Sequence, residues 1–354
     1  MQNSFLGIIE ITLGMTILIL LMLPILKLIG GKFTAKCRYI LWMLVMIRLA
    51  VPFSFGILPA LIEVPVEPEP EPVQIQIPAV SYTPIPQEPA AVPQQEQLQI
   101  PTPPVETPMF TEPAPDPLTW EEISAYIPYL YLTGAAVFLL WNLLAYMIYT
   151  RRILRSAKPA DTGVREIYTA VCCRKGIHHP PVLLISAVVN SPAAFGLIRR
   201  RIVLPDIEFT ENALVGTLSH EVTHCQRGDL WIKAVCLLAR SFHWFNPLIH
   251  LAAFRCEMEM ELSCDESVLA GCSEDTRAVY GEIMLDIIRR CRQNRGALTT
   301  HFNPKKNAVK ARLTNILYGS GKLHGRWLIA VCLILCLAAG TIVACRVEAE
   351  NTEQ

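Results

Sequence analysis

The chain has 354 residues, of which 52% are hydrophobic and 18% charged, and its mean hydropathy of +0.36 is high for a soluble protein. This composition excludes an ordinary soluble globular domain as the whole molecule and indicates a membrane protein with a soluble part. The formal net charge is zero, so no nucleic-acid partner is expected from bulk charge. The 12 cysteines show no zinc-finger or disulfide-framework spacing, which favours reduced thiols in a cytosolic domain.

The first 62 residues predict two transmembrane helices joined by a short basic loop. Residues 5–29 form an apolar run that is too long, and too poor in basic residues at its start, for a cleaved signal peptide. A second apolar run extends from Tyr39 to about Ile62. The loop of residues 31–38 is basic, so we expect it in the cytoplasm and the N-terminus outside. Arg48 lies deep in the second run, where it either serves a function or simply faces protein.

Residues 63–125 predict an extracellular loop. The stretch 63–119 holds 16 of the 27 prolines and has no Lys or Arg. Proline at this density prevents regular helices and sheets and favours extended polyproline II segments. We expect a solvated tether, and the alternative is an arm that binds a ligand, the cell wall or a partner.

Residues 126–149 predict a third transmembrane helix, with tyrosines toward both ends as in an aromatic belt. A basic cluster begins directly after it at Arg151 and places this end in the cytoplasm. Residues 150–325 are then the only segment long enough for a folded soluble domain, which we expect in the cytoplasm. Residues 326–345 predict a fourth span, and the tail 346–354 is expected outside, as is the N-terminus.

Basic residues between positions 289 and 312, the last of them Arg312, alternate with apolar residues before the fourth span. A surface that faces anionic membrane lipid is the simplest interpretation. Contact with an acidic protein substrate or with nucleic acid is the alternative. We expect membrane lipid, and no nucleic acid, as the partner of this segment.

Two short β-strands precede the most informative motif of the chain. Residues 180–186 and 201–205 are typical of strands, and the segment 190–196 between them is rich in turn formers. The edge of a small sheet at this point could hold an extended peptide by backbone pairing. Ser191, Phe195 and Gly196 are the candidate residues of this substrate edge.

The strongest functional signal is the sequence His-Glu-Val-Thr-His at residues 220–224. On a helix, His220 and His224 lie one turn apart on one face, where two imidazoles can bind one metal ion. Zinc suits them, because it accepts tetrahedral nitrogen and oxygen ligands and needs no redox chemistry. Glu221 can take a proton from the water that zinc activates. Thr210 is a suitable N-cap for the helix. The alternative is a helix with two core histidines bonded to polar groups.

A catalytic zinc site needs a third protein ligand and one open position, and a later acidic helix offers that ligand. Glu261 is the preferred residue. Asp265 lies four residues further on the same face and could orient a ligand histidine. Glu259 is an alternative ligand, and a solvated helix face is the interpretation without a metal. Tyr280 and His243 are weak candidates for the group that stabilises the oxyanion.

Taken together, these motifs resemble the BlaR/MecR-type antirepressor metallopeptidases of bacterial drug-resistance regulation, and the similarity covers most of the chain. The residues that carry it are Ser191-Pro192, Phe195-Gly196, Ile202-Val203-Leu204-Pro205, His220-Glu221-Val222-Thr223-His224 with Arg227 and Asp229, Trp244-Phe245-Asn246-Pro247 and Glu261-Leu262-Ser263-Cys264-Asp265. The resemblance implies a bacterial cell-membrane protein with a zincin-type (gluzincin) domain. It also implies one Zn2+ per chain, held by His220, His224 and Glu261, with Glu221 as the catalytic base.

The resemblance further implies an activity and partners. A member of this family is expected to cleave itself and a cytosolic transcriptional repressor after an outside signal, and to form a homodimer. The best-known members carry a penicillin-binding sensor domain outside, after the fourth span, whereas only residues 346–354 follow that span here. The Pro-rich loop is a candidate for a different input.

We therefore expect an α-helical multi-pass membrane protein with four transmembrane helices and a cytosolic α+β metallopeptidase domain. Its expected function is that of a regulatory zinc endopeptidase. A non-proteolytic membrane receptor or scaffold with a structural zinc site is the main alternative, and a constitutive housekeeping membrane protease is a third.

Overall fold

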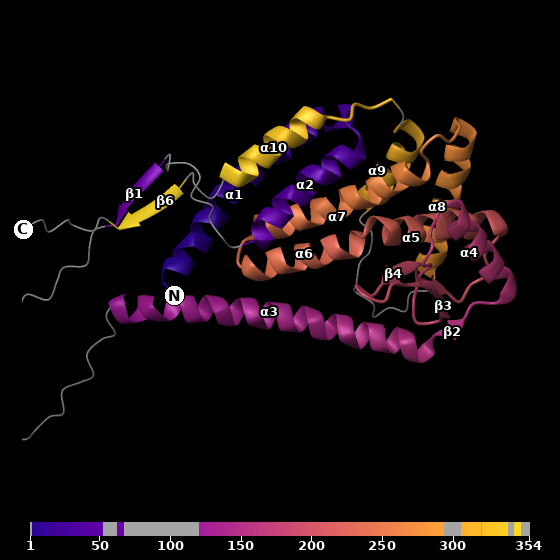
Figure 1. Cartoon of the computed structure of the whole chain (residues 1–354), viewed down its shortest axis with the longest axis horizontal. Coiled ribbons are helices and arrows are strands. Elements are labelled where there is room, and N and C mark those ends of the chain that lie inside the picture. The colour runs from indigo at the N-terminus through magenta and orange to yellow at the C-terminus, as the bar shows by residue number, and fades with distance from the viewer. Residues whose placement is uncertain are drawn as a thin grey trace, which may run out of the picture. The chain divides into compact units, whose positions relative to one another are not determined.

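The computed structural model describes residues 2–51, 62–66, 120–293, 306–319, 321–338 and 343–347 (Figure 1). The chain divides into two units, one of residues 1–65 with 127–346 and one of residues 66–126 with 347–354. The first unit contains the buried core and the four-stranded sheet. Most of the loop expected at 63–125 lies outside the described residues.

Two described helices are long and apolar enough to cross a membrane. One stretch, Ile11–Lys32, lies mostly in α1 (Gln2–Ile29), and the other, Tyr126–Ser156, lies in α3 (Trp120–Ser156). They coincide with the first and third expected spans. By length and composition, the structure therefore supports two of the four expected spans.

The other two expected spans are shorter as helices than predicted. α2 (Ala35–Ala50) has 16 residues, about 24 Å at 1.5 Å per residue, which is less than the roughly 30 Å of a bilayer core. Residues 52–61 of this expected span lie outside the described part. α10 (Arg326–Ala338) is shorter still, and β6 (Val343–Val347) follows it and pairs with β1 (Ile62–Val66).

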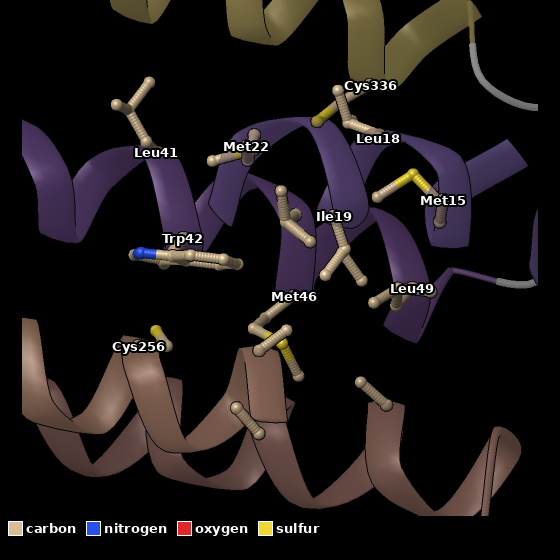
Figure 2. Close-up of a cluster of buried hydrophobic side chains, with 14 of the residues drawn as sticks. Met15, Leu18, Ile19, Met22, Leu41, Trp42, Met46, Leu49, Cys256 and Cys336 are labelled. Atoms are coloured by element: carbon tan, nitrogen blue, oxygen red, sulfur yellow. The ribbon is translucent and has the colours of Figure 1, made fainter. Parts of the chain in front are cut away.

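A large buried cluster joins α2 to two helices of the expected soluble segment, α6 (Asp229–Phe242) and α7 (Pro247–Val268) (Figure 2). Trp42 and Met46 of α2 face Cys256 of α7, and Met15 and Ile19 of α1 lie in the same cluster. Residues 150–325 therefore share a hydrophobic core with the first 50 residues, which holds α7 against α2.

Arg48 is turned toward protein. Its Nε donates to the Cys336 carbonyl oxygen of α10 at 3.1 Å, and its Nη1 donates to the Val51 carbonyl oxygen at 2.9 Å. Arg48 therefore faces protein, as one of the two interpretations predicts, and its hydrogen bond to Cys336 joins α2 to α10.

The expected strands form a mixed sheet in the order β2 (Lys158–Pro159), β3 (Val182–Ser186), β5 (Arg201–Pro205) and β4 (Ala193–Phe195). β3 pairs with β5 in parallel, and β4 pairs with β5 antiparallel, so β4 is an edge strand. Ile202 and Leu204 of β5 lie in one buried cluster with Leu218 and Val222 of α5 (Glu211–Arg227). The sheet thus supports the helix that carries the histidine motif.

Three further helices complete this part of the fold. α4 (Thr162–Arg174) packs on α5, as does α8 (Glu274–Gln293). α9 (Lys306–Tyr318) contacts both α7 and α8. A single-turn 3-10 helix, η1 (Gly30–Lys32), lies between α1 and α2. α5, α7, α8 and α9 therefore meet around one point, where the polar residues of the site converge.

Candidate metal centre

α5 presents the histidine motif on a well-defined helix. The Thr210 hydroxyl accepts the Ala213 N–H at 3.4 Å, which makes Thr210 the N-cap as expected. The helix ends at Gly228, whose φ of 73° is left-handed and suits glycine. This turn sends the chain directly into α6, so Asp229 returns toward the last turn of α5. His220 and His224 are both buried.

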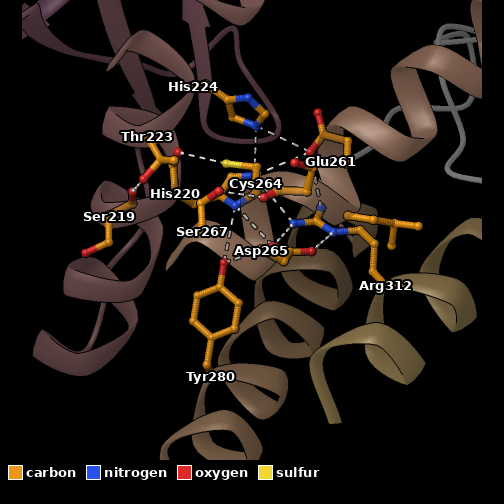
Figure 3. A network of polar contacts seen from close by, with 12 residues as sticks. Ser219, His220, Thr223, His224, Glu261, Cys264, Asp265, Ser267, Tyr280 and Arg312 are labelled. Carbon is orange, nitrogen blue, oxygen red and sulfur yellow. Dashed lines mark hydrogen bonds and ion pairs between the residues drawn. The ribbon is translucent and has the colours of Figure 1, made fainter. Parts of the chain in front are cut away.

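Three potential ligand atoms converge at one point. His220 Nε2 lies 3.0 Å from His224 Nε2, and Glu261 Oε2 of α7 lies 3.3 Å and 3.5 Å from these two nitrogens (Figure 3). Ligands bound at about 2.0–2.1 Å in tetrahedral geometry stand about 3.3 Å apart. The three atoms therefore fit one tetrahedral metal ion. The Glu261 side chain is 32% exposed, so solvent reaches this residue.

Carboxylates orient both imidazoles. Asp229 Oδ2 lies 2.7 Å from His224 Nδ1, and Asp265 Oδ1 lies 3.2 Å from His220 Nδ1. A carboxylate at this position accepts a hydrogen bond from the Nδ1–H group, which leaves the Nε2 lone pair free for a metal. The Tyr280 hydroxyl donates to Asp265 Oδ1 at 3.0 Å and lies 3.2 Å from His220 Nδ1. Asp265 thus lies beside His220 Nδ1, and its role in orienting a metal ligand stays a prediction.

Arg312 of α9 is a residue of the centre that sequence reasoning misplaced on a lipid-facing surface. Its Nε and Nη2 donate to the two oxygens of Asp265, each at 2.9 Å. Its guanidinium also approaches the ligand atoms, with Nη2 at 3.4 Å from His220 Nε2 and Nη1 at 3.7 Å from Glu261 Oε2. Arg312 fixes the carboxylate that orients His220.

The positive groups of the centre keep two of its carboxyls ionised. Burial alone would raise the pKa of Asp265, but Arg312 and His220 outweigh burial and hold the pKa of this carboxyl below its usual range. In the same way, His224, His220 and Arg312 overcome burial and hold the pKa of Glu261 well below its usual range. Both carboxyls are therefore ionised at neutral pH, the form in which a carboxylate binds a metal or accepts hydrogen bonds.

Cys264 is a second candidate for the third ligand. Its sulfur and the two imidazoles form a group whose ligand atoms lie within 4.8 Å of one another. Cys264 is fully buried on α7, and its Sγ lies 3.5 Å from the His220 carbonyl oxygen. The two Nε2 atoms and Glu261 Oε2 form the tighter triangle, so the geometry favours Glu261.

The candidate residues of the substrate edge lie on and beside β4. Phe195 is buried in a small core cluster with Val203, so it supports the strand rather than facing solvent. The Gly196 N–H donates to the Tyr146 hydroxyl at 3.1 Å, and Ser191 is exposed. A cavity of about 240 Å3 lies between the residues after β4 and His224. Its lining residues are Leu197, Ile198, Arg200, His224, Cys225, Gly228, Leu230 and Trp231.

Two weaker candidates lie elsewhere. Glu259 forms a buried ion pair with Arg38 at 2.9 Å, so it is engaged by α2 rather than by the histidines. His243 lies beyond the far end of α6, about 20 Å along the helix from Asp229. It contacts the Thr12 hydroxyl and the Leu49 carbonyl oxygen there. The suggestion that His243 stabilises an oxyanion at the centre is therefore wrong.

Two histidines one turn apart on a helix, with a carboxylate from a second helix, are the arrangement typical of metallopeptidase centres. The chain belongs to the BlaR1 peptidase M56 family, whose model matches residues 6–316. It is thus a member of a peptidase family, and all residues of the centre lie in the matched range.

Several regulatory proteins are similar to this chain. Regulatory protein BlaR1 of Bacillus licheniformis is 31% identical over 150 residues, which are 41% of this chain and 25% of the relative. The methicillin resistance mecR1 protein of Staphylococcus aureus is 26% identical over 103 residues, 28% of this chain and 18% of the relative. Regulatory protein BlaR1 of Staphylococcus aureus is 24% identical over 157 residues, 43% of this chain and 27% of the relative. The chain therefore aligns with about a quarter or less of each relative's length.

Proposed function

We propose that this chain is a membrane-bound regulatory zinc endopeptidase, which cleaves itself, a cytosolic transcriptional repressor, or both, after an extracellular signal. The observation that carries the proposal is the convergence of His220 Nε2, His224 Nε2 and Glu261 Oε2, with Glu221 on the same helix. The donor set of two imidazoles and one carboxylate suits zinc. One zinc ion per chain fits these residues.

The residues of the chain have separate roles in peptide hydrolysis. Zinc, when bound, supplies a Lewis acid that polarises the scissile carbonyl and lowers the pKa of a water molecule. The Glu221 carboxylate accepts the proton of the attacking water and returns it to the leaving amine nitrogen. Asp229 and Asp265 hold the two imidazoles in the orientation that metal binding requires. Arg312 holds Asp265 in place by hydrogen bonds.

An extended peptide is the substrate form that suits the site. β4 is an edge strand, and such an edge pairs with an added strand through backbone hydrogen bonds. The cavity next to His224 could accept an apolar side chain of the substrate, because Leu197, Ile198 and Trp231 line it. These features favour an endopeptidase that binds an unfolded or loop segment of a protein.

The regulatory part of the proposal is supported by the family and by the names of the relatives, two of which are regulatory proteins and one a methicillin resistance protein. A multi-pass arrangement with the centre in the cytoplasm and both termini outside agrees with the basic residues at the C-terminal end of α3. Membrane lipid, a repressor as substrate and a second copy of the chain are the proposed partners.

The experiment uses the full chain in nanodiscs. Wild-type protein is compared with Glu221→Gln and with a matched control, Glu211→Gln, which changes an acidic residue in the first turn of the same helix. Zinc content, self-fragmentation and cleavage of repressors encoded nearby are measured. We expect all three proteins to bind one zinc and only Glu221→Gln to lose cleavage. Equal fragmentation by Glu221→Gln and wild type would contradict the assigned role of Glu221.

A structural zinc site in a non-proteolytic receptor is the second candidate, and the position of Cys264 favours it. If the Cys264 thiolate joined His220, His224 and Glu261, all four positions of a tetrahedral ion would be occupied by protein. A closed site of this kind stabilises a fold and leaves no position for substrate or water. Zinc binding without any cleavage would support this candidate.

A further inference from the structure

The metal ligands come from two separate segments, and both are in contact with the start of α2. His220 and His224 lie on α5, which is followed by Asp229, whereas Glu261 lies on α7. These segments belong to different parts of the chain, so their relative position depends on tertiary contacts. Residues 35–39 of α2 make hydrogen bonds or ion pairs to each of them.

On the α7 side, α2 contacts residues on either side of Glu261. Arg38 Nε donates to Glu259 Oε2 at 2.9 Å, and both side chains are about 10% exposed. Arg38 Nη1 also donates to the carbonyl oxygens of Gly30 and Phe33, each at 2.8 Å, which fixes the guanidinium to the turn before α2. The Glu266 carboxylate of α7 accepts the N–H groups of residues 35 and 36 at 2.8 Å and 3.1 Å. This placement satisfies N–H groups at the start of α2.

On the α5 side, α2 reaches a ligand through one intermediate residue. The Tyr39 hydroxyl donates to Asp229 Oδ1 at 3.2 Å, and Asp229 Oδ2 lies 2.7 Å from His224 Nδ1. The Arg227 guanidinium lies 5.1 Å from the centre of the Tyr39 ring and 3.4 Å from Asp229 Oδ1. Tyr39 and Asp229 are both buried, so water does not replace these contacts readily.

We propose that the first turn of α2 positions the metal ligands: Tyr39 acts through Asp229 on His224, and Arg38 acts through Glu259 on the helix that carries Glu261. Neither residue touches the metal position or a substrate, so both are positioning residues. The inference deepens the proposed function, because it concerns the zinc affinity of the same centre. A displacement of α2 relative to α7 would therefore disturb the positions of both His224 and Glu261. The zinc affinity of the centre would then depend on how the apolar helix α2 packs against α7.

The test measures the zinc dissociation constant of the full chain in nanodiscs by competition with a chelator. Tyr39→Phe removes one hydroxyl and keeps the ring. The matched control is Tyr168→Phe, because the Tyr168 hydroxyl is also buried and donates a hydrogen bond to the Pro181 carbonyl oxygen at 2.6 Å. Loss of a group that orients a metal ligand typically weakens metal binding about 10–100-fold. We expect Tyr39→Phe to weaken zinc binding about 10-fold and Tyr168→Phe to leave it unchanged.

A second measurement separates positioning from a general loss of structure. The melting temperature of the zinc-free protein should be the same for Tyr39→Phe and Tyr168→Phe. In an Asp229→Asn background, Tyr39→Phe should have little further effect on zinc affinity, because the intermediate residue has already lost its carboxylate. If Tyr39→Phe does not fold, Arg38→Lys tests the α7 side of the proposal instead, since it keeps a charge beside Glu259 but loses the bonds that fix this charge to the preceding turn.

Zinc binding by Tyr39→Phe as tight as that of Tyr168→Phe would overturn this inference and leave the proposed function standing. Absence of zinc from the wild-type protein would overturn both. A 10-fold loss confined to Tyr39→Phe, and abolished in the Asp229→Asn background, would support the positioning role.

Discussion

Replacing Arg312 with methionine tests whether the buried charge of Asp265 is held in place from α9. Arg312 donates two hydrogen bonds of 2.9 Å to Asp265, whose side chain is completely buried. Removing one partner of a buried ion pair leaves the other charge uncompensated, which costs about 3–5 kcal/mol. Because 19% of the Arg312 side chain is exposed, water offsets part of this cost, and we expect a loss of about 3 kcal/mol.

The assay is thermal unfolding of the zinc-free protein in nanodiscs. For a folded unit of about 150–250 residues, 1 kcal/mol corresponds to about 2–4 °C, so Arg312→Met should lower the melting temperature by about 6–12 °C. Lys310→Met is the matched control, because it removes a positive charge from an exposed position of the same helix. The double variant Arg312→Met with Asp265→Asn should lose less than the sum of the single variants, since neither charge remains. Melting of Arg312→Met within about 2 °C of Lys310→Met would refute the reasoning.

The remaining predictions concern the ligands and one glycine. Glu261→Gln should weaken zinc binding by 10-fold or more, whereas Cys264→Ser should not, and chelator competition measures both. Glu259→Gln should keep one zinc per chain at saturating zinc, because Glu259 pairs with Arg38 rather than with the metal ligands. Loss of zinc in metal analysis would contradict this prediction. Gly325→Ala should lower the melting temperature more than Gly321→Ala. Both positions have positive φ, but only at 325 would the added Cβ lie 2.7 Å from a cysteine sulfur and 2.8 Å from a phenylalanine ring.

Sequence reasoning succeeded where the determining interactions are local. The spacing of His220 and His224 fixes their common face on any helix, and the Thr210 cap fixes where that helix begins. Glu261 and Asp265 share a face for the same reason, so predicting one helix placed both residues. Asp229 had a signal that was not used: an acidic residue directly after a glycine that ends the histidine helix is placed to return toward its last turn.

Sequence reasoning failed where the interactions are tertiary. Arg312 lies in a basic segment that suits a lipid surface equally well, and only the packing of α9 on α7 brings it to Asp265. Nothing in the sequence of α2 indicates that Tyr39 contacts Asp229 or that Arg38 contacts Glu259. We expected a soluble domain separate from the membrane helices. In the structure, apolar residues of α6 and α7 pack against α2 in one buried cluster.

The central claim is that His220, His224 and Glu261 hold one zinc ion with an open position. X-ray absorption at the zinc edge of the wild-type protein tests it most directly, since it reports the atoms bound to the metal. We expect one zinc per chain with two imidazole nitrogens, oxygen in the remaining positions and no sulfur. A sulfur ligand at about 2.3 Å would place Cys264 in a closed structural site, and the absence of stoichiometric zinc would contradict the account altogether.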